Sequence, residues 1–382
     1  MSKSIRHIQW FMSSILILML LSCSSSSSEE EVAGKDPTEP TMLTVYVYSP
    51  ENPVLTRADV GEIDATSAEI VVKGLQIWIY ETQSGKKVGH LSTEETATLN
   101  MTEGAVYQIP VNDDFAKRKP SVDVYVVANV TAANCGIGTL NGESSWDYLV
   151  ENAKIDEDHF GLTALTTDVP TDGLPMAGEL KNQPVVGNAP VLRVGSLSKI
   201  ATVPLTRAVS KMRFVFANTA NAAKLSIKGI TLKENMIPTV EYLFANSQPL
   251  SYNSTTASLL PTAIDEVKST ANPADYVYNA QTQTAQQYEE QIATGISNNE
   301  LSPVGPYYLR ESNKRLEGTI TYQVEGQEAQ TTTFRISEAG DFKCNHSWIV
   351  YAYYEGLNGM SIVTVDVTPW VPTTGSHSVY NW

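Results

Sequence analysis

Hydrophobic and polar residues alternate along most of this chain. Between residues 122 and 130, for example, an apolar side chain occupies every second position from Val122 to Val130. A period of two places successive side chains on opposite faces of a β-strand, so one face can be buried while the other meets solvent. The same rhythm recurs between clusters of Gly, Pro and Asn, and it predicts a chain that is mostly β.

Several other segments share this pattern. Residues 69–80 place Leu75 and Ile79 on one face of a predicted strand. Gly229 is expected to bend or bulge its strand, and Glu325-Gly326-Gln327 predicts a hairpin turn between two strands. The remaining predicted strands cover residues 42–49, 212–216, 225–227, 319–324, 331–336, 346–354 and 361–368.

Helices are predicted at only two places, both in connections between strands. Ser144-Ser145-Trp146-Asp147 gives a capping-box start for a short helix, and residues 284–293 form the second. Prolines and glycines between Pro184 and Leu197 interrupt the strand pattern and mark a boundary. We therefore expect two tandem β-sandwich domains, which cover residues 58–190 and 191–382.

The N-terminus has the layout of a secretory signal peptide. Lys3 and Arg6 precede an apolar run from Trp10 to Leu21, which is too short to cross a bilayer. Cys23 follows directly, and this arrangement resembles a bacterial lipoprotein signal. The resemblance implies that residues 1–22 are removed and that Cys23 carries lipid, including palmitate. The alternative is a plain secretory peptide with an incidental cysteine.

A polar segment follows Cys23. Five serines lead into three consecutive glutamates, Glu29 to Glu31. This run resembles the export signal of surface-exposed lipoproteins of Bacteroidetes, which implies a place on the outside of the outer membrane. Its simpler interpretation is a solvated tether.

Composition excludes several classes of function. The formal net charge of −16 disfavours a nucleic-acid partner, because a polyanion would be repelled. If Cys23 carries lipid, only Cys135 and Cys344 remain for the folded part, and we expect them to be free or buried thiols rather than a disulfide. The chain has five histidines and neither CxxC nor HExxH, so no metal site or cofactor is expected.

The sequence gives no positive support for a catalytic motif. The chain contains no G-x-S-x-G. The acidic residues Asp156, Glu157 and Asp158 could hold calcium or act as paired carboxylates, but they lack the spaced ligands of a calcium loop and are more typical of a solvated loop. His346 could act as a base, although a structural role is favoured. The sequence therefore predicts no catalytic residues and no enzyme.

Four short motifs occur in order along the chain. They are Gly173-Leu174-Pro175-Met176-Ala177-Gly178, Leu205-Thr206-Arg207-Ala208-Val209-Ser210-Lys211, Asn345-His346-Ser347-Trp348 and Val367-Thr368-Pro369-Trp370. Beneath a lipoprotein signal, their order and spacing resemble the fimbrillins of Bacteroidetes. These type V pilins are lipoprotein precursors that polymerise into fimbriae. The resemblance covers nearly the whole chain.

This resemblance implies a fold, a maturation pathway and partners. It implies two transthyretin-like β-sandwich domains, delivery to the outer membrane, and removal of an N-terminal segment by an Arg-specific protease. The matching bond joins Arg57 to Ala58, so residues 23–57 would be a propeptide. The partners would be like subunits in a homopolymer, together with the anchor and tip subunits of the fimbrium.

The propeptide contains its own predicted strand. Leu43, Val45 and Val47 share one face of this segment, which is expected to belong to the first sandwich. A cut after Arg57 would leave the strand held only by non-covalent contacts. Its departure would expose an apolar groove with unpaired backbone groups, which recruits another strand.

The C-terminal end offers two sources for a replacement strand. Residues 363–367 have the same alternation as the propeptide strand, although an ordinary core strand of the second domain is an equal alternative. The twelve residues after Trp370 form a short tail with late apolar anchors. The candidate donor residues are Val363, Val365, Val367, Trp370, Val379, Tyr380 and Trp382.

The tetrapeptide around the predicted cleavage bond occurs twice. Leu55-Thr56-Arg57-Ala58 is repeated as Leu205-Thr206-Arg207-Ala208, so these residues alone cannot direct processing. Arg57 follows Pro50 and Pro53, which favours an exposed loop, whereas Arg207 precedes a long strand. Because proteases need extended and mobile backbone, Arg57 is the predicted site.

The sequence thus predicts a structural fimbrial subunit, most simply of the shaft, that supports adhesion. A tip, accessory or anchor subunit is an alternative within the same class. A glycan-binding surface lipoprotein is an alternative from another class, because exposed aromatic rings stack on sugars. The aromatic residues considered for that role are Trp78, Trp146, Tyr307 and Tyr308.

Overall fold

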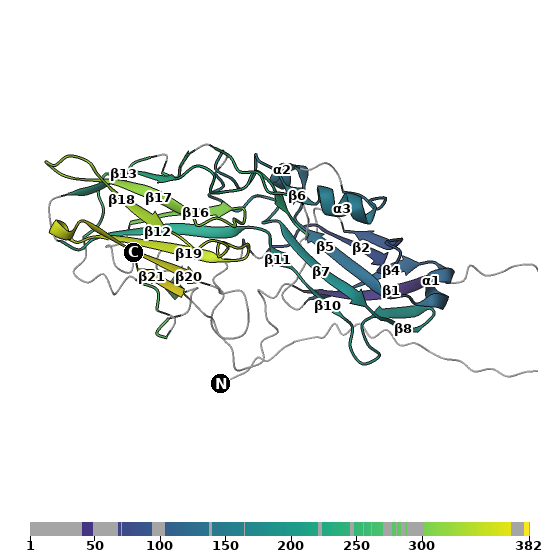
Figure 1. Ribbon diagram of the computed structural model, residues 1–382. Helices are drawn as coiled ribbons and strands as arrows, with labels where there is room; N and C mark the ends of the chain where they lie inside the picture. The colour runs from purple at the N-terminus through teal and green to yellow at the C-terminus, as the bar shows by residue number, and fades with distance from the viewer. Residues whose placement is uncertain are drawn as a thin grey trace, which may run out of the picture. The chain divides into compact units, whose positions relative to one another are not determined.

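The first half of the chain folds into two β-sheets that face each other, as the alternating pattern predicts. The computed structural model places β1, purple in Figure 1, inside the first sheet, between β4 on one side and β9 and β10 on the other. That sheet contains β1 (Thr41–Tyr48), β4 (Ala105–Val111), β8 (Val185–Asn188), β9 (Val191–Val194) and β10 (Thr202–Pro204). The second sheet has the order β11-β7-β5-β2-β3 and contains β2 (Leu75–Glu81), β3 (Lys87–Ser92), β5 (Val122–Ala128), β7 (Met176–Gln183) and β11 (Thr206–Arg207).

The structure describes most of the chain from residue 40 onward. The described residues are 40–48, 68–69, 71–93, 104–136, 140–163, 165–220, 224–244, 248–254, 256–260, 262–269, 277–279, 281–283, 287–288, 302–367 and 378–381. Residues Pro40–Trp382 form one compact unit. The lipidation residue Cys23, the predicted cleavage bond Arg57-Ala58, and the candidate donor residues Trp370 and Trp382 lie outside the described residues.

The two sheets of the first sandwich enclose one hydrophobic core. The inner face of β5 carries Val122, Val124, Val126 and Ala128, which are all buried in it, as the period of two predicts. The strand predicted to start at residue 69 begins instead at Leu75, and its opposite face is buried as well. Trp78 and Tyr80 on that face pack beneath the helices that cover the sheet.

The second half forms another pair of facing sheets. One has the order β16-β12-β19-β20-β21 and contains β12 (Ser210–Asn218), β16 (Ser302–Leu309), β19 (Ser347–Tyr354), β20 (Met360–Val367) and β21 (Ser378–Asn381). The other has the order β15-β13-β17-β18 and contains β13 (Leu225–Leu232), β15 (Ala257–Ser258), β17 (Glu317–Val324) and β18 (Gln330–Arg335). The predicted bulge occurs where the register shifts between Ile227 and Gly229. The predicted hairpin joins β17 to β18.

Short helices lie in the connections between strands. The helix predicted from the capping box is α3 (Trp146–Asn152), and the Ser145 side chain accepts a hydrogen bond from Tyr148 N at its start. The others are α1 (Asp113–Arg118), α2 (Ala132–Cys135) and the 3-10 turn η2 (Gly356–Asn358). Most of the helix predicted over 284–293 lies outside the described residues. Within the described part of the chain, no helix is long and apolar enough to cross a membrane.

The boundary between the two sandwiches falls later than residue 190. Strands β9 and β10 follow that residue, yet both pair with β1 in the first sandwich. The core of the first sandwich extends to Leu205, and the core of the second begins at Met212. We therefore propose a domain boundary near Arg207. A two-stranded sheet of β6 (Lys154–Ile155) and β14 (Glu241–Tyr242) connects the loops of the two halves.

Candidate assembly site

The predicted propeptide strand is an inner strand of its sheet. Residues 41–47 of β1 pair antiparallel with β4 over seven positions. On the other side, residues 42–44 pair in parallel with β9 and residues 46–48 pair in parallel with β10. Met42 N also donates to Pro190 O at 2.8 Å, and Leu205 N donates to Tyr48 O at 2.8 Å. The strand is therefore hydrogen-bonded along both edges.

The inner face of β1 is fully buried. Leu43, Val45 and Val47 are each 0% exposed and belong to the core of the first sandwich. On the outer face, the rings of Tyr46 and Tyr48 stack with centroids 6.4 Å apart and are half-buried. The three residues predicted as anchors are thus brought together at one site, and the core lies on one side of the strand only.

Removal of β1 would convert this site into a groove. The floor would be the apolar side chains that now contact Leu43, Val45 and Val47, and the rims would be β4 on one side and β9 with β10 on the other. A strand that runs in the direction of β1 would restore both ladders, because the rims are antiparallel and parallel to it, respectively.

The candidate donor strand β20 is buried on both of its faces. It pairs with β19 over eight positions and with β21 over four. Ile362 points into the core of the second sandwich, while Val363 and Val365 pack in a separate cluster with Tyr351 on the opposite face. These contacts favour the interpretation of β20 as an ordinary core strand.

The C-terminal tail supplies one more strand at the end of that sheet. β21 contains Val379 and Tyr380 and stands last in the strand order, next to β20 (Figure 1). Its pairing covers only residues 378–381, opposite residues 363–366. Separation of this four-residue ladder at the end of the sheet would break fewer backbone pairs than separation of the eight-residue ladder between β20 and β19.

The described residues of the four motifs that carry the fimbrillin resemblance, which for the fourth motif is Val367 alone, are linked near the junction of the two sandwiches. Thr206 pairs with Ala177, which joins the first motif to the second. Asn345 N donates to Val209 O at 2.9 Å, which joins the second to the third. Ser347 pairs with Val367 at the start of the fourth. The motifs therefore define one structural region rather than a dispersed set of positions.

A buried ionic cluster lies at this junction. Lys211 Nζ is 2.9 Å from Glu69 Oε1, and both side chains are 1% exposed. Tyr308 donates to the same oxygen at 2.5 Å, and Arg207 Nε donates to the backbone oxygen of Glu69 at 3.0 Å. Burial alone would raise the pKa of Glu69, but Lys211, Tyr308 and Arg207 together hold it below its ordinary value.

Sequence reasoning missed this cluster. Glu69 was expected at the start of a strand, and nothing local distinguishes it from a solvated carboxylate. Lys211 and Arg207 lie about 140 positions away along the chain, so only the fold brings the charges together. The sequence contains a weak signal of the cluster. Lys211 and Arg213 alternate with Met212 and Phe214 in a strand that leaves neither face for exposed polar side chains.

The second copy of the repeated tetrapeptide is inaccessible. Arg207 is 0% exposed, and its backbone pairs with Met176 in β7. Proteolysis requires an exposed segment of extended backbone, so the bond after Arg207 is protected in the folded chain. The first copy of the tetrapeptide lies outside the described residues.

The other chemical candidates have structural partners. His346 Nδ1 lies 2.9 Å from Asp366 Oδ2, a pair that connects β19 to β20. Burial raises the pKa of Asp366, and His346 opposes that shift. The partner of His346 was not predicted; the antiparallel register pairs Asp366 with Trp348, two positions after His346.

The acidic loop is organised by its own hydrogen bonds. Asp156 Oδ1 lies 2.6 Å from His159 Nδ1 and accepts from Asp158 N at 3.1 Å. The Arg310 guanidinium donates to the backbone oxygens of Asp156 and His159. Among the described residues, no group of three or more His, Cys, Asp or Glu side chains is arranged to hold a metal ion.

The two cysteines are free thiols, as the sequence analysis favoured. Cys135 is buried, and Cys344 is partly exposed. Burial raises the pKa of Cys135 to about 12 and raises that of Cys344 as well. Both side chains therefore stay protonated at neutral pH and are poor nucleophiles.

Most of the aromatic residues considered for glycan binding are buried. Trp78 is 0% exposed, Tyr307 is 2% exposed and Tyr308 is 3% exposed, so none of them presents a ring to a sugar. Trp146 on α3 is 38% exposed, and Tyr148 beside it is 46% exposed. Of the four residues named for glycan binding, only Trp146 has an accessible ring.

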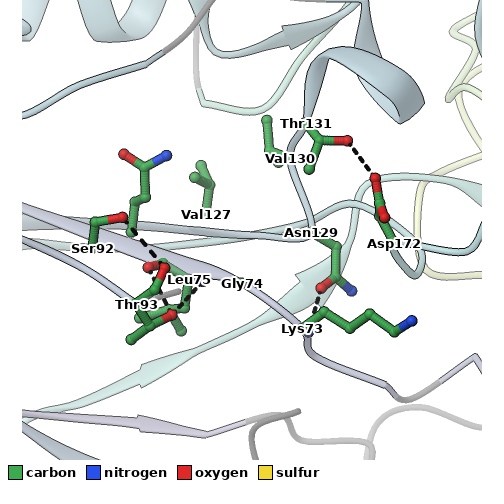
Figure 2. A pocket seen from close by; sticks show the side chains of 11 residues that line it. Lys73, Gly74, Leu75, Ser92, Thr93, Val127, Asn129, Val130, Thr131 and Asp172 are labelled. Atoms are coloured by element: carbon green, nitrogen blue, oxygen red, sulfur yellow. Dashed lines mark hydrogen bonds between the residues drawn. The ribbon is translucent and has the colours of Figure 1, made fainter. Parts of the chain in front are cut away.

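A small pocket opens between β2, β3 and the segment that follows β5. Figure 2 shows its polar lining, in which Thr131 donates to Asp172 at 2.9 Å and Lys73 N donates to Asn129 Oδ1 at 2.8 Å. Its cavity volume is about 40 Å³, whereas small-molecule sites usually measure roughly 300–1,000 Å³. The pocket can hold water molecules but is too small for a cofactor.

The sequence matches no protein-family model and no curated relative. Several solved structures are similar to the chain. The tip fimbrial protein Mfa3 from Porphyromonas gingivalis, with a C-terminal truncation, is 12% identical with a TM-score of 0.46, over 90% of this chain and 99% of that one. A candidate cell adhesion protein from Bacteroides eggerthii is 14% identical with a TM-score of 0.44, over 92% and 98% of the two chains. Another from Parabacteroides distasonis is 14% identical with a TM-score of 0.46, over 90% and 97%.

Proposed function

We propose that this chain is the precursor of a structural fimbrial subunit, a shaft pilin that polymerises by donor-strand exchange and supports adhesion. The observation that carries the proposal is the position of β1. It is hydrogen-bonded along both edges and fills a core with Leu43, Val45 and Val47, yet it precedes the predicted cleavage bond after Arg57. A cut at that bond would therefore leave β1 attached to the mature subunit only by non-covalent contacts.

Maturation proceeds in two steps under this proposal. Residues 1–22 direct export, Cys23 takes up lipid, and the precursor reaches the cell surface as an outer-membrane lipoprotein. An Arg-specific protease then cuts between Arg57 and Ala58. The cut separates the lipid anchor and β1 from the mature subunit, residues 58–382, which becomes free to enter a fimbrium with like subunits and with anchor and tip subunits.

Burial energies explain why exchange needs a replacement strand. Each buried Val or Leu contributes about 1.5–3 kcal/mol, so the three inner side chains of β1 hold it firmly even after the cut. A donor with similar anchors recovers the same burial and the same backbone hydrogen bonds. Assembly can then proceed without ATP.

The proposed donor is the C-terminal tail of another copy rather than β20. Loss of β20 would open two apolar clusters, one on each face of the strand. The described part of the tail, residues 378–381, pairs with β20 over four positions. Val379, Tyr380 and Trp382 are the anchors that it would offer to the groove.

Processing of an Arg57→Ala variant tests the proposal. The precursor should fold, because β1 keeps its place, but Arg-specific digestion should no longer release the propeptide or yield multimers. Arg315→Ala is the matched control, since it removes an arginine whose side chain is 41% exposed and should leave the first cut unchanged. Intact mass and native sizing measure both results. Multimers of normal length from Arg57→Ala would contradict the proposal.

A glycan-binding surface lipoprotein is the second candidate. The exposed rings of Trp146 and Tyr148 on α3 favour it. Such a protein would keep residues 23–57 and remain monomeric after digestion, whereas a pilin would lose them and polymerise. A tip, accessory or anchor subunit would share the fold but would not extend into long homopolymers.

A further inference from the structure

The ladder on one side of β1 has a gap at its centre. Residues 42–44 pair with β9 and residues 46–48 pair with β10, while Val45 falls between the two short ladders. The chain between β9 and β10 closes on itself there, since Ala201 N donates to Val194 O at 2.7 Å. The rim next to the middle of β1 therefore consists of two separate pieces, whereas the β4 rim is continuous.

A second irregularity lies next to this gap. Thr44 is 5% exposed, and among the described residues its Oγ1 has no hydrogen-bond partner. Thr44 lies opposite Gln108 of β4 and Arg193 of β9, on the outer face of the sheet. By contrast Thr364 in β20, which is 0% exposed, donates to Arg335 O at 2.7 Å.

These two features act in the same direction. A buried hydroxyl without a partner loses its hydrogen bonds to water and gains nothing in return. A ladder in two pieces pairs fewer positions along this edge of β1 than a continuous ladder would. Both features weaken β1 near its centre and leave the anchors Leu43 and Val47 on either side intact.

We propose that Thr44 and the ladder gap at Val45 form a built-in weak point that sets how fast β1 is replaced. This inference rests on the proposed function and adds its regulation. The weak point also selects the occupant, since a strand with an aliphatic side chain at the Thr44 position fits the groove better than β1 does. Exchange then favours the incoming strand without any change in the groove itself.

Strand uptake by the cut chain tests this inference. The full chain is cut after Arg57 and mixed with excess of a fluorescent synthetic peptide that corresponds to residues 40–49, and peptide uptake is followed by anisotropy. Thr44→Val in the chain should slow uptake about tenfold, which corresponds to about 1.4 kcal/mol. Thr44→Ser keeps the hydroxyl and should exchange within about twofold of the wild-type rate.

Thr202→Val is the matched control, because Thr202 lies on the same sheet next to Tyr46 and is not fully buried. It should not slow uptake. Equal rates for the wild type and Thr44→Val would overturn the inference while the proposed function stands. If no variant takes up the peptide, including the wild type, the proposed function fails and the inference fails with it.

Discussion

Strands β1 and β20 are both eight residues long, and both alternate apolar and polar side chains, yet the fold holds them in different ways. β1 buries one face in one core, and its outer face is half-exposed at Tyr46 and Tyr48. β20 contributes to two apolar clusters, one on each face. Under the proposed function, departure of β1 would expose one apolar core, whereas departure of β20 would expose apolar clusters on both of its faces.

Sequence alternation alone therefore does not distinguish the two strands. Under the proposed function, the strand that leaves should have one buried face and lie before the proposed cleavage bond. β1 fits this requirement and β20 does not. Matched substitutions in the two strands test this difference.

The largest effect is expected from a charge placed in each strand. Val45→Asp and Val365→Asp both bury a carboxylate at a position that is 0% exposed, so each should lower the free energy of unfolding of the uncut chain by at least about 3 kcal/mol. Multimers assembled from the two variants should differ. Those of Val45→Asp should match the wild type in urea, because β1 is gone, while those of Val365→Asp should not. Equal destabilisation of both multimers would refute the distinction.

The next effect concerns the ionic cluster, which we expect to stay with the mature subunit. Lys211→Met leaves the Glu69 carboxylate without its nearest cation and should cost about 3 kcal/mol in uncut chain and multimer alike. The control Lys233→Met breaks a pair with Glu317 in which the lysine side chain is 51% exposed, so it should cost less than about 1 kcal/mol. Urea titration measures both.

The pH dependence of the Lys211→Met effect follows from the pKa of Glu69. Because that pKa is lowered in the folded state, the charged carboxylate stabilises the fold at pH values above the ordinary pKa of 4.5. This contribution is lost as pH falls through the lowered value. The penalty of Lys211→Met should therefore shrink in acid, and a penalty that grows in acid would contradict the assignment.

A smaller effect is expected from Glu241. Its contribution to stability should be the same before and after strand exchange. Burial and the neighbouring Glu311 raise its pKa to about 9. The folded state then holds a proton that the unfolded state releases above pH 4.5, so stability falls as pH rises from about 4.5 to 9. Glu241→Gln should remove this decline and raise Tm at pH 8 by about 5 °C. A wild-type pH profile in Glu241→Gln would contradict the prediction.

The smallest effect compares one hydroxyl in each strand. Thr364→Val removes the hydrogen bond to Arg335 O and should destabilise the uncut chain by about 1 kcal/mol. Thr44→Val removes a hydroxyl without a described partner and should stabilise it by a similar amount. Thermal unfolding of the uncut chain measures both, and effects of the same sign would remove this part of the comparison.

Much of the β structure could be predicted because period-two alternation reports a strand with one buried face. The inner face of β5, the shift at Gly229, the hairpin between β17 and β18, and the start of α3 were all confirmed. Local chemistry determines each of these features. No long-range information is needed.

The remainder depends on long-range placement. Alternation does not reveal that β9 and β10 share one edge of β1, and this pairing is the reason for proposing a boundary later than residue 190. It also does not reveal where both faces of a strand are covered, as at Trp78, whose ring the glycan-binding alternative requires to be accessible and which is 0% exposed. The cluster of Glu69 and Lys211 arises only when distant segments meet.

The central claim is that β1 is present in the precursor and absent from the polymer. It is tested most directly by mass spectrometry of multimers purified after Arg-specific digestion. The account predicts that no peptide containing Leu43–Tyr48 remains in washed multimers and that their subunits begin at Ala58. Multimers that retain the β1 peptide in one-to-one ratio with the subunit would contradict it.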